Sequence, residues 1–548
     1  MDRLIIRRGR PILAASLLML LIAAVIHGQE PADRASEFVI SFIESELQMN
    51  PIYSYTMTEA QIFTGLYEGL VSYHPLTMEP VPGVAERWEV SSDGLVYTFH
   101  LRRDARYSNG DPVLAEDFRQ TWLTLLSPRT DAAYNFLFDV IAGVREYRSG
   151  ENPDREAVGI RAIGPRTLEV VLRQPATHFL RILCHHAFVP VHPSVRSVVD
   201  WSDLETIPGN GAYRLHSRST GEMLLVRNQH YWDASRVAIP RIRMRFFSPE
   251  DDQVTERFNN GEVDWVSSGM RLGEVLTPRT IVVNPLFATN YYFMQSRREP
   301  FNDPRIRRAL TLLLPLDQIR DPELLFMPTD VLVPSIPFYP EVQGISGSDR
   351  DQALALLEDA GYPDGTGLPV LVVHIPDGQE PLRVAELMKD AWEEQLDVTT
   401  EIRVTPYSRY FDALKTRDFT VGTIGWIGDF ADPLTFLQMW ITDSNVNDAG
   451  FSDFRYDELI DRSMSLTGVA RYNALGEAEE ILLQTGTVIP VSHSPAINLI
   501  DLQAVDGWHP NPLDIHPLKY LRFTDSAPVP GVIRFDQHRE FQLYSSAQ

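Results

Sequence analysis

The length and composition of this 548-residue chain limit how many domains it can form and which classes of partner it can bind. A formal net charge of −25 at pH 7 leaves no basic excess to neutralise phosphates, which argues against nucleic-acid binding. Cys184 is the only cysteine, so neither a disulfide framework nor a cysteine-based zinc site can form within one chain. The chain is too long for one ordinary core and is expected to form two or three domains.

The first 28 residues predict an export signal. A basic segment, MDRLIIRRGR, precedes an apolar run, PILAASLLMLLIAAVIHG, and we expect cleavage near Gly28-Gln29. The alternative is a retained single-span anchor, because the apolar run borders on spanning length. No cysteine follows the run, so a bacterial lipid anchor is not predicted. The mature protein is expected to be exported and soluble.

Strand-like and helix-like segments alternate along the rest of the chain. Residues 37–44 predict a strand, residues 59–71 a helix, and residues 88–101 a hairpin. Asp111-Pro112 is predicted to cap and start the next helix. Further helices are predicted at 304–314, after Asp351 and at 470–483, and further strands at 168–172, 224–226, 239–247, 369–375, 399–404 and 488–491. Such alternation implies α/β lobes that bind a ligand between them.

The stretch FTVGTIGWIGDFADPLTFLQMW, residues 419–440, is the most informative part of the chain. Its first eight residues have the composition of a buried strand, and glycine inside a strand indicates that a backbone or ligand comes close. Asp429 then lies on a loop at the strand end, beside Trp426 and Phe430. A carboxylate flanked by aromatic rings can receive a cation there. The alternative is that Asp429 only shapes a turn.

Enzyme signatures are missing from the sequence. It contains no G-x-S-x-G motif, P-loop, HExxH motif or dinucleotide fingerprint. Cys184-His185-His186 is interpreted as a packing segment, because no partner motif for a metal or thiol site lies nearby. His493 follows a predicted strand and is a candidate to face a ligand. We therefore expect neither catalysis nor a cofactor.

Several motifs occur in an order typical of one protein family. They are GLYEGL at 65–70, PVPGVAERWEVSSDGLVYTFHLRRDARYSNGDPVLAEDF at 80–118, NGAY and YW at 210–213 and 231–232, NNGEVD at 259–264, PFNDPRIRRA at 300–309, LLEDAGY at 356–362 and GWIGDFADPLTF at 425–436. Together they resemble the oligopeptide- and dipeptide-binding proteins of bacterial ABC importers, family 5 of the extracellular solute-binding proteins. Each motif is weak alone, but the set is specific.

The resemblance implies an α/β, two-lobed periplasmic-binding-protein fold (class II, cluster C type) with an extra domain and a hinge between the lobes. Residues 29–56, 180–283 and 497–548 would form lobe I, residues 57–179 the extra domain, and residues 284–496 the other lobe. It also implies a monomeric receptor that captures short peptides in a closing cleft. The receptor would deliver them to an ABC permease and ATPase complex in the inner membrane.

The resemblance also suggests roles for particular residues. Asp429 falls where the family's acidic residue meets the peptide α-ammonium, and the strand from Thr423 through Gly425 to Trp426 would pair with the peptide main chain. Trp426, Tyr407 and Tyr134 match positions of aromatic rings around side-chain pockets; ordinary packing is the alternative.

Carboxylate recognition departs from the family pattern. Thr423 stands where the best-studied oligopeptide binder has an arginine that helps to meet peptide carboxylates, and Arg417 loosely matches a second family arginine. Longer peptides, capped peptides and non-peptide ligands therefore remain open. The alternatives are the same fold with an oligosaccharide, opine or metal-chelate cargo, an exported peptide hydrolase, and a signalling receptor.

Overall fold

One ten-stranded mixed sheet runs through both lobes of the molecule. The computed structural model describes residues 36–524, apart from 203, 205, 249–250 and 324–326. The strand order is β14-β13-β15-β12-β16-β11-β1-β10-β9-β8. These strands are β1 (Glu37–Ile43), β8 (Tyr213–Ser219), β9 (Glu222–Arg227), β10 (Arg241–Phe247), β11 (Trp265–Val266), β12 (Ile281–Met294), β13 (Leu371–Pro376), β14 (Thr400–Thr405), β15 (Val421–Ile427) and β16 (Val488–Ile500).

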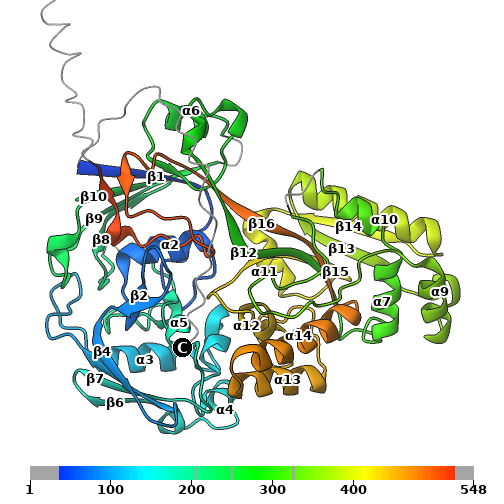
Figure 1. Ribbon diagram of the computed structural model, residues 1–548, viewed down its shortest axis with the longest axis horizontal. Helices are drawn as coiled ribbons and strands as arrows, with labels where there is room; N and C mark the ends of the chain where they lie inside the picture. The colour runs from blue at the N-terminus through cyan, green and yellow to red at the C-terminus, as the bar shows by residue number, and fades with distance from the viewer. Residues whose placement is uncertain (1–35, 203, 205, 249–250, 324–326, 525–548) are drawn as a thin grey trace, which may run out of the picture.

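The first lobe, on the left of Figure 1, is built around β1. This strand lies parallel to β10 and β11, and β8, β9 and β10 form an antiparallel meander beside it. Phe38 and Ile40 of β1 are fully buried. The chain leaves β1 at Ile43 and at once reaches the region between the lobes.

An extra domain with its own antiparallel sheet is attached to the first lobe. The sheet has the order β4-β5-β7-β6 and lies at the lower left of Figure 1. Trp122 of α3 is fully buried there, and its indole N–H donates to the Phe188 carbonyl at 3.1 Å. The elements of this region are α2 (Met57–Leu66), β2 (Val71–Tyr73), β3 (Pro80–Pro82), β4 (Ala85–Val90), β5 (Val96–Leu101), α3 (Ala115–Leu125), α4 (Val144–Ser149), β6 (Ile160–Gly164), β7 (Thr167–Val171) and α5 (Phe179–Ile182).

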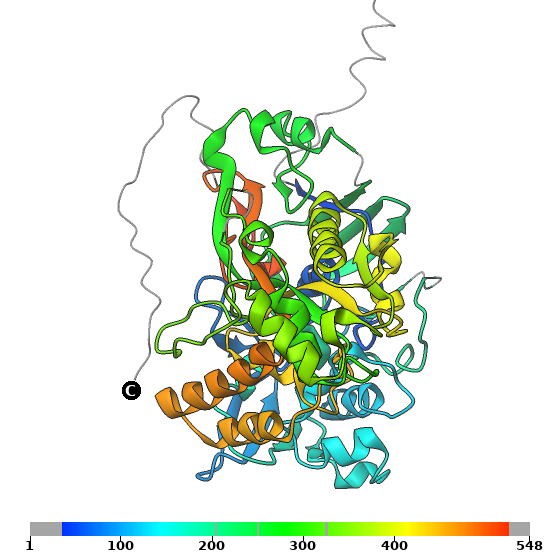
Figure 2. The same ribbon diagram turned by 90° about the vertical axis from the view of Figure 1, so that its right-hand side faces the viewer.

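The second lobe surrounds β13, β14 and β15 with helices. Its core contains the fully buried Trp392, whose indole N–H donates to the Leu310 carbonyl at 2.9 Å. Figures 1 and 2 show α13 and α14, both orange, lying side by side. The helices are α7 (Pro304–Leu312), α8 (Leu316–Ile319), α9 (Arg350–Asp359), α10 (Gln379–Gln395), α11 (Tyr407–Leu414), α12 (Leu434–Leu437), α13 (Phe454–Ser465) and α14 (Gly468–Gln484). The remaining elements, in the first lobe, are α6 (Val254–Asn259), β17 (Val505–Asp506) and β18 (Arg522–Phe523).

Two long antiparallel strands, β12 and β16, link the lobes (Figure 1). Their pairing is irregular between Pro285 and Thr289, and Pro285 lies opposite Pro495. The sequence analysis did not predict β12 and predicted only residues 488–491 of β16. Proline inside a strand normally argues against that strand, because it cannot donate to the ladder. Here the two prolines lie together where the ladder is already interrupted.

Most predicted elements are confirmed to within a few residues, but one helix end and two helix starts are wrong. The helix predicted at 59–71 ends at Leu66, and Val71 already belongs to β2. The helix expected at Asp111-Pro112 begins at Ala115, because Asp117 accepts a hydrogen bond from the Leu114 N–H at 2.9 Å and forms the cap. Asp111 instead closes a turn in which its N–H donates to Asn109 Oδ1 at 3.1 Å. The N-cap of α9 is Asp349, not Asp351.

The two ends of the chain carry predictions that the structure does not address. The predicted signal peptide at residues 1–28 and the last part of predicted lobe I, residues 525–548, lie outside the described residues. Within the described part of the chain, no helix combines the length and apolar character needed to cross a bilayer. The domain boundaries at residues 56, 179, 283 and 496 stay predictions.

Candidate functional site

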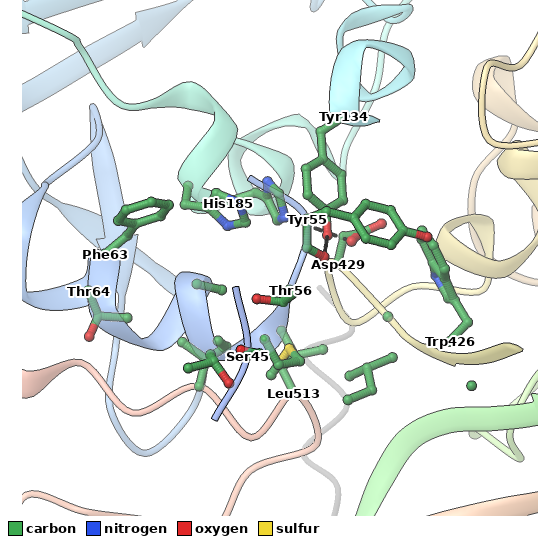
Figure 3. A pocket seen from close by; sticks show the side chains of 18 of the residues that line it. Ser45, Tyr55, Thr56, Phe63, Thr64, Tyr134, His185, Trp426, Asp429 and Leu513 are labelled. Carbon is green, nitrogen blue, oxygen red and sulfur yellow. Dashed lines mark hydrogen bonds and ion pairs between the residues drawn. The ribbon is translucent and has the colours of Figure 1, made fainter. Parts of the chain in front are cut away.

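A cavity of about 1080 Å³ lies between the lobes. Its volume is at the upper end of what ligand pockets show. The first lobe and extra domain line it with residues 43–46, 55–58, 60, 63–64, 67–69, 71–73, 134, 184–186, 189, 513, 515 and 517. The second lobe contributes residues 377–378, 406–407, 411 and 424–429. Figure 3 shows side chains from both lobes converging on this space.

One edge of β15 is open towards the cavity. Among the described residues, β12 pairs with β15 along its whole length, whereas β13 pairs with it only at Val421. On that second edge, Tyr410 Oη donates to the Thr423 carbonyl and accepts from the Thr423 N–H, both at 3.0 Å. Backbone groups two residues apart face the same edge of an antiparallel strand. The N–H and C=O of Gly425, an exposed residue that lines the cavity, therefore face this open edge.

Asp429 lies in the loop that follows β15 and is 8% exposed. Its N–H donates to Thr435 Oγ1 at 2.8 Å, and that hydroxyl donates back to Asp429 Oδ2 at 3.2 Å. Tyr73 from the other lobe donates its hydroxyl to the Asp429 carbonyl at 3.2 Å. The loop that holds the carboxyl is thereby fixed from both lobes.

No cationic side chain among the described residues neutralises Asp429 in this state. The nearest basic group is His185 Nε2, 3.7 Å from Asp429 Oδ1. Burial raises the pKa of Asp429 to about 8, while burial and the neighbouring His186 hold the pKa of His185 well below its usual range. Both groups are therefore uncharged near neutral pH, and a cationic ligand would supply the missing countercharge.

Aromatic side chains surround the same carboxyl group (Figure 3). Tyr134 stacks on Tyr55 with ring centroids 6.0 Å apart, and its hydroxyl donates to the Tyr55 carbonyl at 3.1 Å. Tyr55 also contacts Trp426 at 6.4 Å and Phe411 at 5.5 Å. Tyr407 lies at the rim and is 59% exposed. Five predicted residues, Asp429, Trp426, Gly425, Tyr407 and Tyr134, thus line one cavity.

Three predicted residues do not line the cavity. The Thr423 hydroxyl donates to the Tyr291 carbonyl on β12 at 2.9 Å, which keeps its side chain in the sheet. His493 is buried on β16, with Nδ1 2.9 Å from Thr289 Oγ1. Arg417 adopts a left-handed backbone with φ +54° and donates to the Asn447 carbonyl at 3.4 Å. Because these three residues are not part of the cavity lining, their expected contacts with the ligand stay predictions.

Several lining residues escaped the sequence analysis. Tyr55 directly precedes the capping box that Thr56 and Glu59 form at the start of α2, which is a signal for a fixed turn but not for a binding site. His185 was interpreted as packing; it is buried, and it also faces Asp429. No cluster of three potential metal ligands occurs among the described residues.

Comparison with known proteins identifies the family. The model of the bacterial extracellular solute-binding proteins, family 5, matches residues 79–448. The chain belongs to this family. It is 30% identical to the periplasmic oligopeptide-binding protein OppA of Escherichia coli K12, over 82% of this chain and 85% of that protein. The resemblance drawn from the sequence motifs is thereby confirmed.

Solved structures of family 5 proteins confirm the two-lobed fold. The chain is similar to OppA of Haemophilus influenzae in complex with the peptide RPPGFSPFR, with a TM-score of 0.79, 25% identity and coverage of 90% and 99% of the two chains. With the unliganded open form of the murein tripeptide-binding protein MppA, the TM-score is 0.61 at 25% identity and coverage of 89% and 97%. The lobes here are therefore arranged more like the peptide complex than like the open form.

Proposed function

We propose that this protein captures short peptides between its lobes and delivers them to the permease of an ABC importer. The observation that carries the proposal is the open edge of β15, which runs past Gly425 and ends at the buried carboxyl of Asp429. A peptide main chain needs paired N–H and C=O partners in line, with a countercharge at its amino end. Strand addition along Gly425 would supply the first, and Asp429 the second.

This mode of binding reads the backbone rather than the sequence of the peptide. Side chains would project into the space bounded by Tyr55, Tyr134 and Trp426, whose flat rings accept many shapes. Water in a cavity of about 1080 Å³ can fill what the side chains leave empty. The family membership and the relative crystallised with RPPGFSPFR support a peptide as cargo.

The role of Asp429 can be tested with matched peptides. An α-ammonium that loses its buried partner leaves one charge uncompensated, a cost of about 3–5 kcal/mol. We expect Asp429→Ala to weaken binding of a free peptide strongly and to leave binding of the N-acetylated peptide nearly unchanged. Isothermal titration calorimetry measures both affinities. Equal losses for the two peptides would overturn the ammonium contact.

The cargo itself can be identified directly from the purified protein. Native mass spectrometry of the mature chain, residues 29–548, purified without refolding, would reveal retained ligand. A series of bound masses that sequence as short peptides would support the proposal and give the preferred length. A single non-peptide mass would keep the fold and overturn the peptide cargo.

The proposal extends to the setting in which the receptor works. We infer a periplasmic monomer released from its signal peptide near Gly28-Gln29, a role in binding rather than catalysis, and no nucleic-acid partner. The acidic charge of −25, the basic-apolar amino-terminal segment and the family membership support this setting. N-terminal sequencing of the exported protein would test the cleavage point.

A further inference from the structure

The acidic side chains that line the cavity have no lysine or arginine counterpart in the described lining. The lining includes Glu44, Glu46, Glu68, Asp377 and Asp429, and it contains neither lysine nor arginine among the described residues. A peptide carboxylate inside this space would meet carboxylates and no guanidinium or ammonium group. A positively charged ligand group would meet only attractive charges.

Glu68 does not contribute free charge to the cavity, because the protein already neutralises it. Lys519 Nζ lies 2.8 Å from its carboxylate, and Tyr231 and Trp232 each donate a hydrogen bond to it at 2.6 Å. Glu68 is thus a structural ion pair at the cavity wall.

Glu44, Glu46 and Asp377 remain available to a ligand. Glu44 and Glu46 follow β1 in the first lobe, both are exposed, and their carboxylates make no hydrogen bond or ion pair with any described residue. Asp377 follows β13 in the second lobe, where it caps α11 by accepting from the Tyr407 N–H at 2.7 Å. No described lysine or arginine forms an ion pair with it. Closure therefore brings unneutralised carboxylates from both lobes to one cavity.

Buried polar groups without partners point independently to a ligand in this space. Tyr67 and Trp426 line the cavity and are 4% and 5% exposed. Neither the Tyr67 hydroxyl nor the Trp426 indole N–H has a hydrogen-bond partner among the described residues. Leaving such donors unpaired lowers the stability of the folded protein. A ligand that accepts hydrogen bonds, such as a peptide carbonyl, would pair with them and remove that cost.

We propose that the cavity selects cationic peptides and leaves the peptide's terminal carboxylate outside. The α-ammonium meets Asp429, and a basic side chain is held by Glu44 and Glu46 from one lobe and by Asp377 from the other. This inference rests on the proposed function and adds the charge class of the substrate. Ser45, which lies between the two glutamates in the sequence, and Asp429 both line the pocket shown in Figure 3, so the α-ammonium and the basic side chain would meet different carboxyl groups of one cavity.

The test is a set of peptides that differ in one charge. Peptides of one length carry lysine, Nε-acetyl-lysine or glutamate at one internal position, which is scanned along the chain, each with a free or amidated C-terminus. At the best position we expect about tenfold tighter binding with lysine than with acetyl-lysine, weaker binding still with glutamate, and a preference that shrinks with added salt. Amidation should change the affinity by less than about twofold, because an outer carboxylate is screened.

Variants assign the preference to particular side chains. Glu44→Gln combined with Glu46→Gln should remove most of the lysine preference while the acetyl-lysine peptide binds as before. The control combines Glu358→Gln with Glu394→Gln, which removes the same net charge from exposed positions outside the cavity lining and should keep the preference. If both double variants lost the lysine preference equally, Glu44 and Glu46 would not be its source.

The outcomes separate this inference from the proposed function. Equal affinity for lysine and glutamate peptides, or a tenfold loss on amidation, would overturn the charge selection and leave peptide binding intact. A protein that binds no peptide of the series would overturn the proposed function itself.

Discussion

Asp429 and His185 face each other across the boundary between the lobes, with Oδ1 and Nε2 3.7 Å apart and both side chains buried. Burial favours the uncharged form of each, so neither member of the pair supplies a countercharge to the other. A bound ammonium would change the protonation of one member of the pair. The next two predictions depend on the raised pKa of Asp429.

Peptide binding should release a proton. Because the pKa of Asp429 is about 8 in the empty cavity, the carboxyl is mostly protonated at pH 6 to 7, where a peptide ammonium is still charged. Binding the ammonium requires the carboxylate, so we expect about one proton released per peptide in this range and tighter binding as the pH rises towards 8. Calorimetry in buffers of different ionisation enthalpy measures the proton. Asp429→Asn should abolish the release.

The same carboxyl should make the ligand-free protein less stable as the pH rises. Its pKa is raised from an ordinary 3.8 to about 8, so the folded state holds this proton more tightly than the unfolded chain does. That contribution to stability is complete below about pH 4 and is lost as the pH rises through 8. Melting temperatures of the wild type and Asp429→Asn should therefore diverge between pH 4 and 8, in favour of the variant. Parallel curves across this range would contradict the raised pKa.

Asp461 should stabilise the closed arrangement of the lobes. It lies on α13 of the second lobe, where Oδ1 accepts from Arg173 at 2.5 Å and from Arg145 at 3.3 Å, both in the extra domain. Asp461→Ala should weaken peptide binding about threefold, since these groups are partly exposed, and should enlarge the ligand-free protein in small-angle scattering. Glu477→Ala, which breaks a pair with Arg462 inside one lobe, is the control and should do neither.

The ion pair between Asp432 and Arg471 should anchor the loop that carries Asp429. Two hydrogen bonds of 2.7 and 2.8 Å join the buried groups. Burial alone would raise the pKa of Asp432, but attraction by Arg471 outweighs it and the pKa is lowered. Arg471→Met alone should cost about 3–5 kcal/mol of unfolding free energy, because the remaining carboxylate is buried unpaired. The double variant with Asp432→Leu should lose less, and denaturant unfolding distinguishes the two.

The variant Tyr410→Phe should show how far along the open edge of β15 a bound peptide pairs. The change leaves the N–H and C=O of Thr423 without their present partner, at a cost of about 1–3 kcal/mol. A peptide strand that reaches Thr423 would restore those hydrogen bonds. We therefore expect the loss in melting temperature to be smaller with saturating peptide than without. An equal loss in both states would place the end of peptide pairing at Gly425.

The sequence predicted the site where its signals are local. Asp429 could be placed on a loop after a strand because the strand-like composition and the glycines lie within a few residues of it. Asp432 follows in the same loop, where its carboxylate accepts from the Leu434 N–H at 3.0 Å and also pairs with Arg471. The two-lobed fold was predicted from the family motifs, because no single segment specifies how the lobes form.

The rest of the site depends on contacts between distant parts of the chain. Tyr55 and His185 reach the carboxyl from the other lobe, and nothing in their own segments predicts that approach. His493 shows the reverse case: it follows a strand-like run, but the continuation of β16 carries it into the sheet, against Thr289, and its contact with a ligand stays a prediction. In both cases the position of the side chain depends on contacts with residues far away in the sequence.

The pairing of β12 with β16 makes the junction between the lobes a ribbon of backbone hydrogen bonds rather than a pair of loose loops. The ladder between the two strands is interrupted next to Pro285 and Pro495, so fewer backbone hydrogen bonds resist a change of twist there than in the continuous part of the ribbon. No strand has to be unpaired and rebuilt in each cycle. Ligand binding can therefore hold the lobes together to the extent that the ligand binds the closed arrangement more tightly than the open one.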